Sequence, residues 1–416
     1  MLDNLVTILL FLLVFCLIVV SHEFGHYIVA KMNGVRVLEF GIGMGPKIVS
    51  FRKNGTDYCI RLFPLGGACV YEMTDDALDY IDDKTIFQKA RIKADEHDES
   101  IVQNARGSFS GADSRLEKVR SEAKIAKLSN TSNEAGEDAG FLYERPGIPY
   151  YKASVLSRIS IIIAGPLFNF ILAYLLALIV VWNTGTTLPE ITGVMDGYPA
   201  KEAGIMPGDI ITSMNGSHVY LANEIYVNTY LNQERDMTIE FLRDGKKHTV
   251  TVTPKYSEEA GRYLVGFNGY GRYVTCKDAS LFKYSYYEVR YGFVGTAKSI
   301  LMMLQGRGSK DDVAGPVGMA QAIDEVKDAA SPYGPWVVLL NMFNIAMLLS
   351  VNLGILNLLP LPAIDGGKLI FLIIEAVRGK PVPPEKEGIV HLIGFALLFA
   401  LMMFVMYNDI MRIVTG

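Results

Sequence analysis

The chain has 416 residues, of which 50% are hydrophobic, and carries a net charge of −5. Its mean hydropathy of +0.25 is high for a soluble enzyme, and its length predicts two or three structural units. The negative charge gives no reason to expect a nucleic acid as partner. Four cysteines without CxxC spacing, one of them inside an apolar run, argue against a disulfide framework.

Four segments are apolar enough to cross a bilayer, because each approaches the roughly 20 residues that a spanning helix needs. They are residues 5–30, 155–182, 336–359 and 389–407. No basic stretch precedes the first segment and no small-residue cleavage site follows it, so we expect a retained helix rather than a secretory signal. The sequence therefore predicts a multi-pass α-helical membrane protein with four transmembrane helices in a lipid bilayer.

Basic residues near the ends of these helices indicate an orientation. The second loop, which joins the second and third helices, has only two basic residues near its ends, Lys201 and Lys327. The first and third loops together carry Lys31, Arg36, Lys47, Arg145, Lys152, Lys368, Arg378, Lys380 and Lys386. By the positive-inside rule these two loops are predicted to be cytoplasmic. Both termini and the loop at residues 184–335 are then predicted to lie outside the cytoplasm.

The first loop begins with alternating apolar and polar residues on both sides of Asn54-Gly55. This pattern predicts a β-hairpin close to the membrane. From Thr74 to Gly140 the chain becomes charged and poor in aromatic residues. That composition predicts a small helical insertion or a partly disordered segment.

The second loop carries ITGVMDGYPAKEAGIMPGDIITSMNG at residues 191–216, then a helical stretch at 223–232 and a strand pair around Asp244-Gly245. Over residues 186–272 this succession of turns resembles a PDZ domain of the kind found in bacterial proteases. A PDZ groove captures peptides by strand addition and can hold a terminal carboxylate in backbone amides. A small β domain of another kind is the alternative.

Residues 21–26, SHEFGH, close the apolar run of the first predicted helix. His22 and His26 are four residues apart, so both imidazoles point to one face of a helix, and Glu23 lies beside them. In the H-E-x-x-H pattern two histidines hold Zn²⁺ and the glutamate takes a proton from water. Because ionisable groups inside a membrane are costly and usually functional, we favour a metal site over polar contacts within a helix bundle.

A zinc site needs a third protein ligand, and the sequence offers two carboxylates for it. Glu39 lies in a strand-like, glycine-rich stretch, which is poor geometry. Asp365 follows Pro360 and Pro362, which cannot continue a helix. Irregular backbone in a hydrophobic region is tolerated only where it is buried in protein or lines a cavity. We therefore expect Asp365 to be the third ligand, the alternative being that it only caps the next helix.

The expected depths agree with this choice. At 1.5 Å per residue, His22 lies about 26 Å along its helix from Leu5, towards the cytoplasmic face. The third span enters from outside, so its end, with Asp365, is predicted at the same level.

HEFGH, the PDZ-like segment and NLLPLPAIDGG together resemble the site-2 protease family. More closely, they resemble the bacterial intramembrane zinc metalloproteases of regulated intramembrane proteolysis that have a single PDZ domain. Further matches are FPLGG (63–67), SRISIIIAGPLFNFILA (157–173), GPVGM (315–319) and YNDI (407–410).

The resemblance implies a zinc metalloendopeptidase with His22, His26 and Asp365 as ligands and Glu23 as general base. It also implies that four further residues line the substrate path, namely Asn169, Asn357, Pro360 and Pro362. We expect the hairpin edge at Gly66-Gly67 to receive the substrate as an added strand.

The family acts on single-span membrane proteins, for example anti-sigma factors or signal-peptide remnants. The resemblance therefore implies a bacterial cytoplasmic membrane protein whose active site lies near the cytoplasmic face. The PDZ domain is expected to bind a substrate C-terminus or to act as a size filter, and no nucleic acid is expected.

Two other interpretations remain. One is a membrane-anchored zinc protease of the soluble type, in which Glu39 is the third zinc ligand. The other is a PDZ scaffold or a transporter with a vestigial site.

The expected organisation is a first helix (1–33), a hairpin region (34–73), a charged insertion (74–150), a second helix (151–183), the PDZ domain (186–272), a connector (273–334), a third segment (335–378) and a fourth helix (388–411).

Overall fold

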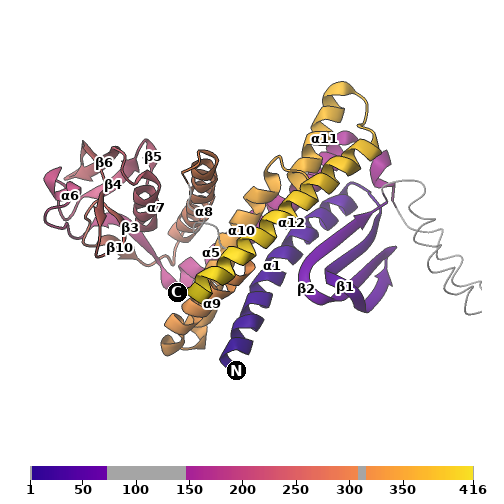
Figure 1. Cartoon of the computed structure of the whole chain (residues 1–416), viewed down its shortest axis with the longest axis horizontal. Coiled ribbons are helices and arrows are strands. Elements are labelled where there is room, and N and C mark those ends of the chain that lie inside the picture. The colour runs from indigo at the N-terminus through magenta and orange to yellow at the C-terminus, as the bar shows by residue number, and fades with distance from the viewer. Residues whose placement is uncertain (1, 73–146, 308–314, 416) are drawn as a thin grey trace, which may run out of the picture. The chain divides into compact units, whose positions relative to one another are not determined.

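The structure, a computed structural model, describes residues 2–72, 147–307 and 315–415 (Figure 1). Nearly all of the predicted charged insertion, 74–150, lies outside the described residues. The chain divides into two compact units. One consists of Met1–His26, Pro64–Gly66 and Ile159–Gly416, and the other of Tyr27–Phe63 and Gly67–Arg158.

Four helices of the described chain are long and apolar enough to span a membrane. They are α1 (Leu2–Met32), α5 (Val155–Thr184), α10 (Pro335–Leu358) and α12 (Pro384–Thr415). The predicted spans agree with three of these helices to within a few residues. The fourth helix is longer at both ends than the predicted span, because polar residues continue the helix beyond the apolar stretch.

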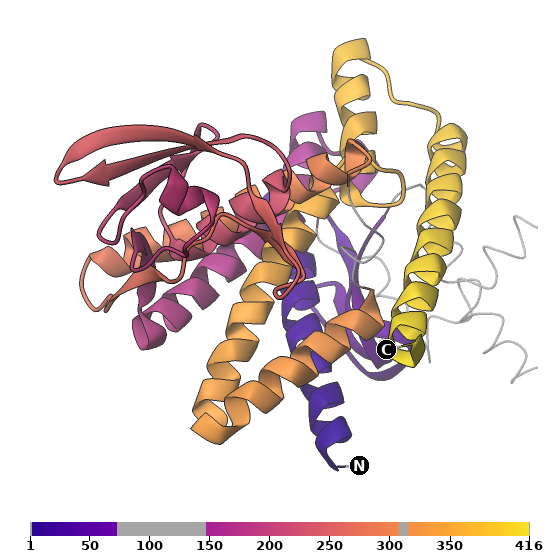
Figure 2. The same ribbon diagram turned by 60° about the vertical axis from the view of Figure 1, so that its left-hand side comes forward.

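An apolar core joins α1, α5 and α10 with the shorter helix α9 (Pro316–Ala330) (Figure 2). Val14 of α1, Ala177 of α5, Ile323 of α9 and Met342 of α10 are all buried in it. Small residues allow α1 and α5 to approach closely, because a Cβ at Gly25 would clash with the backbone of Ala164. This packing brings the HExxH turn of α1 against α5.

Helix α10 ends at Leu358, and α11 (Asp365–Arg378) begins after a loop formed by residues 359–364. The prediction that the two prolines interrupt the third span is therefore confirmed. The short loop between the helices is tightly folded, and Ala363 in it has φ +75°. A Cβ at Gly366 would clash with the carbonyl of Leu359, so the start of α11 packs directly against the end of α10.

Residues 186–274 form a small antiparallel sheet with its own core, which includes Ile211, Met214, Ile239 and Phe241. The strand order is β10-β3-β4-β6-β7, with β5 paired to β4, and β8 pairs with β9 separately. The expected turn at Asp244-Gly245 joins β6 to β7. The elements are β3 (Thr186–Ile191), α6 (Pro199–Glu202), β4 (Ile210–Met214), β5 (Ser217–His218), α7 (Ala222–Asn232), β6 (Met237–Arg243), β7 (Lys246–Val252), β8 (Lys255–Ser257), β9 (Arg262–Leu264) and β10 (Tyr270–Val274).

The predicted connector, 273–334, is mostly helical. It contains α8 (Ser280–Leu304), α9 and the 3-10 turn η5 (Ser331–Tyr333). Helix α8 contacts α7 through an ion pair of Arg290 with Glu224 at 2.9 Å and a hydrogen bond from Lys298 to Asn228 at 2.8 Å. None of these elements was predicted from the sequence.

The second compact unit contains the predicted hairpin, formed by β1 (Val37–Lys53) and β2 (Thr56–Tyr71). Lys53 pairs with Thr56 across Asn54-Gly55, whose φ angles are +50° and +74°. Positive φ at both central residues is the geometry of a two-residue hairpin turn, so the predicted turn is confirmed. The unit also contains the 3-10 turn η3 (Tyr150–Lys152).

Candidate metal centre

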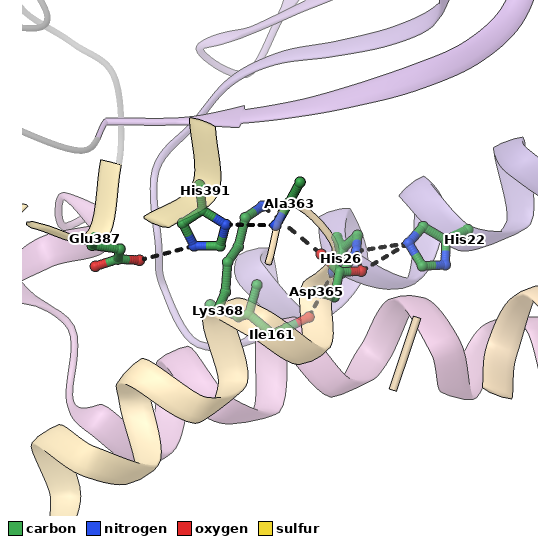
Figure 3. A network of polar contacts seen from close by, with 8 residues as sticks. All are labelled: His22, His26, Ile161, Ala363, Asp365, Lys368, Glu387 and His391. Carbon is green, nitrogen blue, oxygen red and sulfur yellow. Dashed lines mark hydrogen bonds and ion pairs between the residues drawn. The ribbon is translucent and has the colours of Figure 1, made fainter. Parts of the chain in front are cut away.

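The histidines of α1 and the first residue of α11 meet in the described structure (Figure 3). Asp365 Oδ2 lies 3.0 Å from His22 Nε2 and 3.1 Å from His26 Nε2, and the two Nε2 atoms are 3.2 Å apart. All three residues are buried. Among the described His, Cys, Asp and Glu residues, this is the group placed to hold a metal ion.

Asp365 does not act as the cap of α11. The helix begins at Asp365 itself, its N-cap residue is Ile364, and no side chain makes a capping hydrogen bond there. The second carboxylate oxygen, Oδ1, lies 3.8 Å from Lys368 Nζ. The alternative of a simple helix cap is therefore wrong, because the carboxylate points to the histidines instead.

The backbone of α5 sets the tautomer of His26. His26 Nδ1–H donates to the carbonyl oxygen of Ile161 at 2.8 Å. A neutral imidazole that carries its proton on Nδ1 has its lone pair on Nε2. The Nε2 atom of His26 thus faces Asp365 and His22 as an electron-pair donor.

Asn169 of α5 contacts the other histidine. Its Nδ2 atom lies 3.2 Å from His22 Nδ1, while its Oδ1 atom is buried and has no hydrogen-bond partner in the described part of the chain. The two amide orientations of an asparagine are interchangeable in such a position. With the amide turned over, Oδ1 accepts from His22 Nδ1–H, and the lone pair of His22 moves to Nε2.

Gly165 leaves the space that the histidines occupy. A Cβ at this position would clash with His26 Nε2 and lie 2.7 Å from His22 Cε1. Ser350 of α10 donates to the backbone carbonyl of Asn169 at 2.8 Å, one turn further along α5. The segment at 157–173 is one of those that resemble the family, but the resemblance assigned no role to Gly165, and the structure shows the close approach that requires a glycine there.

The three side chains fit a zinc ion. Nitrogen and oxygen ligands at 2.0–2.1 Å from a tetrahedral zinc lie about 3.3 Å from one another. The three measured separations, 3.0, 3.1 and 3.2 Å, are close to that value. The donor set of two imidazoles and one carboxylate is one that zinc accepts, and it leaves a fourth position.

Glu23 is half-buried and follows His22 directly on α1. At 3.6 residues per turn it lies about 100° from His22 and about 60° from His26 around the helix axis. The carboxylate therefore belongs to the same side of α1 as the two imidazoles.

Glu39, the other candidate ligand, has different partners within the hairpin. Its carboxylate lies 2.5 Å from Lys47 Nζ and 2.5 Å from Arg61, and Cys59 Sγ donates to it at 3.2 Å. Burial acts to raise the pKa of Glu39, but the hydrogen bonds from Lys47 and Arg61 outweigh it and hold the pKa below its usual value. Two cations thus already neutralise this carboxylate.

The expected substrate-path residues occupy different surroundings. Asn169 is fully buried against His22. Asn357, in the last turn of α10, is half-buried, Pro360 is exposed and Pro362 is half-buried. Gly66 has φ +87°, and in the hairpin Gly67 pairs with Ile42. Their roles toward a substrate stay predictions.

One polar contact near the site was missed. His391 of α12 accepts a hydrogen bond at Nδ1 from the backbone N–H of Ala363, at 2.9 Å. A histidine inside the last apolar segment was the signal in the sequence.

Comparison with known proteins gives consistent results. The sequence model of peptidase family M50 matches residues 10–401. The chain is 34% identical to the zinc metalloprotease RasP of Bacillus licheniformis, over 98% of this chain and 99% of that protein. It is 33% identical to the regulator of sigma-W protease RasP of Bacillus subtilis, with the same coverage. A solved PDZ domain of an SdrC-like protein from Listeria monocytogenes is 17% identical, over 19% of this chain and 84% of that chain. Its TM-score is 0.18, and we base no assignment on it.

Proposed function

We propose that the chain, which belongs to peptidase family M50, the site-2 proteases, is an intramembrane zinc endopeptidase. Its family and its relatives show that it is a metallopeptidase. It hydrolyses peptide bonds within or beside the transmembrane helix of single-span membrane proteins. One relative at 33% identity is named as a regulator of sigma-W protease, which supports anti-sigma factors as one substrate class.

The four long apolar helices support a place in the bacterial cytoplasmic membrane. The histidine pair stands near the end of α1 that carries Lys31, so the positive-inside rule puts the reaction near the cytoplasmic face. In this arrangement both termini and the sheet domain at 186–274 are extracytoplasmic. That domain, as a PDZ domain, binds a substrate C-terminus or filters substrates by size.

His22, His26 and Asp365 would hold zinc, which when bound lowers the pKa of water and polarises a carbonyl group. Glu23 accepts a proton from the attacking water and passes it to the leaving amide nitrogen. Ile161, and Asn169 with its amide turned over, keep the two imidazoles in the tautomer that has its proton on Nδ1 and its electron pair on Nε2. Because the three ligand side chains are buried, they are held in one arrangement before substrate arrives.

A transmembrane helix must unwind before its peptide bonds can be attacked, since its amides are already hydrogen-bonded. The hairpin edge at Gly66-Gly67 receives the unwound strand by backbone pairing. Asn357 lies in the last turn of α10, and the exposed Pro360 lies in the loop that leads from α10 to Asp365, which supports a role for both in guiding that strand.

The convergence of two imidazoles and one carboxylate at the end of an apolar helix carries this proposal. It is tested by co-expressing the full chain with single-span substrates and comparing wild type with Glu23→Gln. Glu202→Gln, at an exposed position of α6, is the matched control. Cleavage should be lost only with Glu23→Gln while bound zinc is retained, and a Glu23→Gln protein that still cleaves would overturn the mechanism.

A further inference from the structure

His391 places a polar ring in the apolar stretch of α12. It belongs to α12, and its Nδ1 atom accepts the backbone N–H of Ala363 at 2.9 Å, as Figure 3 shows. Nε2, the other ring nitrogen, is buried and lies 3.7 Å from Glu387 Oε1, one turn earlier on α12. The neutral ring that accepts at Nδ1 carries its proton on Nε2, so this proton faces the glutamate.

Ala363 has a conformation that alanine adopts at a cost. Its φ of +75° lies in the left-handed region, where a Cβ is unfavourable. Such a residue keeps its conformation only when its surroundings determine it. The hydrogen bond to His391 is one such constraint, because it fixes the direction of the Ala363 N–H.

A second contact supports the same loop from the same helix. A Cβ at Gly394, three residues beyond His391, would clash with Pro362, so α12 lies directly on the backbone of the loop. Phe371 of α11 packs beside the His391 ring, with 5.6 Å between ring centroids. The loop that precedes Asp365 is thus held between α11 and α12.

We propose that His391 is a positioning residue for the metal centre. It fixes the peptide of Ala363 and thereby sets Asp365, two residues later, at the distance from His22 and His26 that zinc requires. The proposal rests on the proposed function, since it takes Asp365 as a zinc ligand. Because Nδ1 accepts the N–H of Ala363, the proton of the neutral His391 ring lies on Nε2.

Packing of α12 against the helix bundle does not by itself account for the hydrogen bond between His391 and Ala363. Few residues in the apolar stretch of α12 are buried, so the helix adds little to the core. At its other end, Asp409 accepts the backbone N–H of Gly318 at 2.8 Å. These two polar contacts at opposite ends of α12 therefore allow loosening of the helix to be separated from release of the Asp365 loop.

The test uses the full chain, purified in detergent and loaded with zinc. The readouts are the rate of zinc release to a chelator, per folded molecule, and kcat and KM on a single-span substrate. His391→Leu removes the acceptor, and His391→Asn keeps an acceptor oxygen near the position of Nδ1. Asp409→Ala is the control at the far end of α12.

We expect His391→Leu to release zinc about tenfold faster or more, with a matching fall in kcat and little change in KM. His391→Asn should stay within about threefold of wild type, and Asp409→Ala should melt earlier with an unchanged rate of zinc release. If His391→Leu does not accumulate, His391→Ser, too short to reach Ala363, takes its place.

Equal rates of zinc release for His391→Leu and wild type overturn the inference and leave the proposed function standing. Equal losses for His391→Leu and His391→Asn, or faster release with Asp409→Ala, overturn it as well, because they point to packing of the ring or of α12. A wild-type chain that neither binds zinc nor cleaves would instead refute the proposed function.

Discussion

Gly165 lies directly against His26, and a methyl group on its α carbon would clash with the Nε2 atom of the imidazole. The absence of a side chain on α5 is therefore part of the metal centre. The same glycine would also crowd the ring of His22. Its closeness to both rings makes it a sharper test of the site than a ligand substitution.

Gly165→Ala should remove most of the bound zinc and all cleavage, because the added methyl displaces His26. Metal content of the purified chain and cleavage of a single-span substrate measure this. Gly295→Ala is the control, since a Cβ at Gly295 on α8 meets nothing within 4 Å. Alanine in a helix is favoured over glycine by about 1 kcal/mol, so the control should bind zinc normally and be no less stable.

The third ligand is tested by two alanine substitutions. Asp365→Ala should lose zinc and activity, since it removes one of three converging donors. Glu39→Ala should retain zinc, because Lys47 and Arg61 already engage Glu39. The opposite pattern, with zinc lost from Glu39→Ala and kept by Asp365→Ala, would support a protease of the soluble type.

Substitutions of Asn169 test whether its side chain accepts a hydrogen bond from His22 Nδ1 or donates one to it. Asn169→Ala should weaken zinc binding about 10- to 100-fold, the usual effect of losing a group that orients a metal ligand. Asn169→Asp can only accept a hydrogen bond and should stay close to wild type. The measurement is competition with a chelator of known affinity. A carboxylate that is as harmful as alanine would show that Asn169 donates to His22 Nδ1.

Acid should loosen the hairpin formed by β1 and β2. Burial acts to raise the pKa of Glu39, but the hydrogen bonds from Lys47 and Arg61 together outweigh it and hold the pKa in the folded chain below its usual value. A lowered pKa stabilises the fold fully above the unfolded value of about 4.3, and this stabilisation is lost as the pH falls through the folded pKa. Hydrogen exchange of the β1–β2 amides, corrected for intrinsic rates, should accelerate below about pH 4 in wild type. In Glu39→Gln the change should be much smaller.

Much of the local structure followed from the sequence. The four apolar helices and the Asn54-Gly55 turn are signalled by residues close together in the chain, through hydropathy, periodicity and turn chemistry. The break between α10 and α11 followed from Pro360 and Pro362 for the same reason. Helices α8 and α9 were missed because neither is apolar enough to be recognised by hydropathy.

For the metal site, too, the part within one segment follows from the local sequence, whereas the contact between distant segments depends on tertiary packing. The pairing of His22 with His26 is set by the 3.6-residue period of one helix, and the sequence also favoured Asp365 over Glu39 through the depth of two spans. Whether Asp365 reaches the histidines, 343 residues from His22, depends on how the helices pack.

The sequence by itself determined the four apolar helices, the Asn54-Gly55 turn and the histidine pair, because each is a property of a short segment. Only the tertiary structure decided that Gly165 makes room for the imidazoles, that Asn169 contacts His22 and that His391 holds Ala363. These contacts join residues 28 to 147 positions apart. They arise where helices cross, and the periodicity of a single helix does not record which residue of its neighbour it will touch.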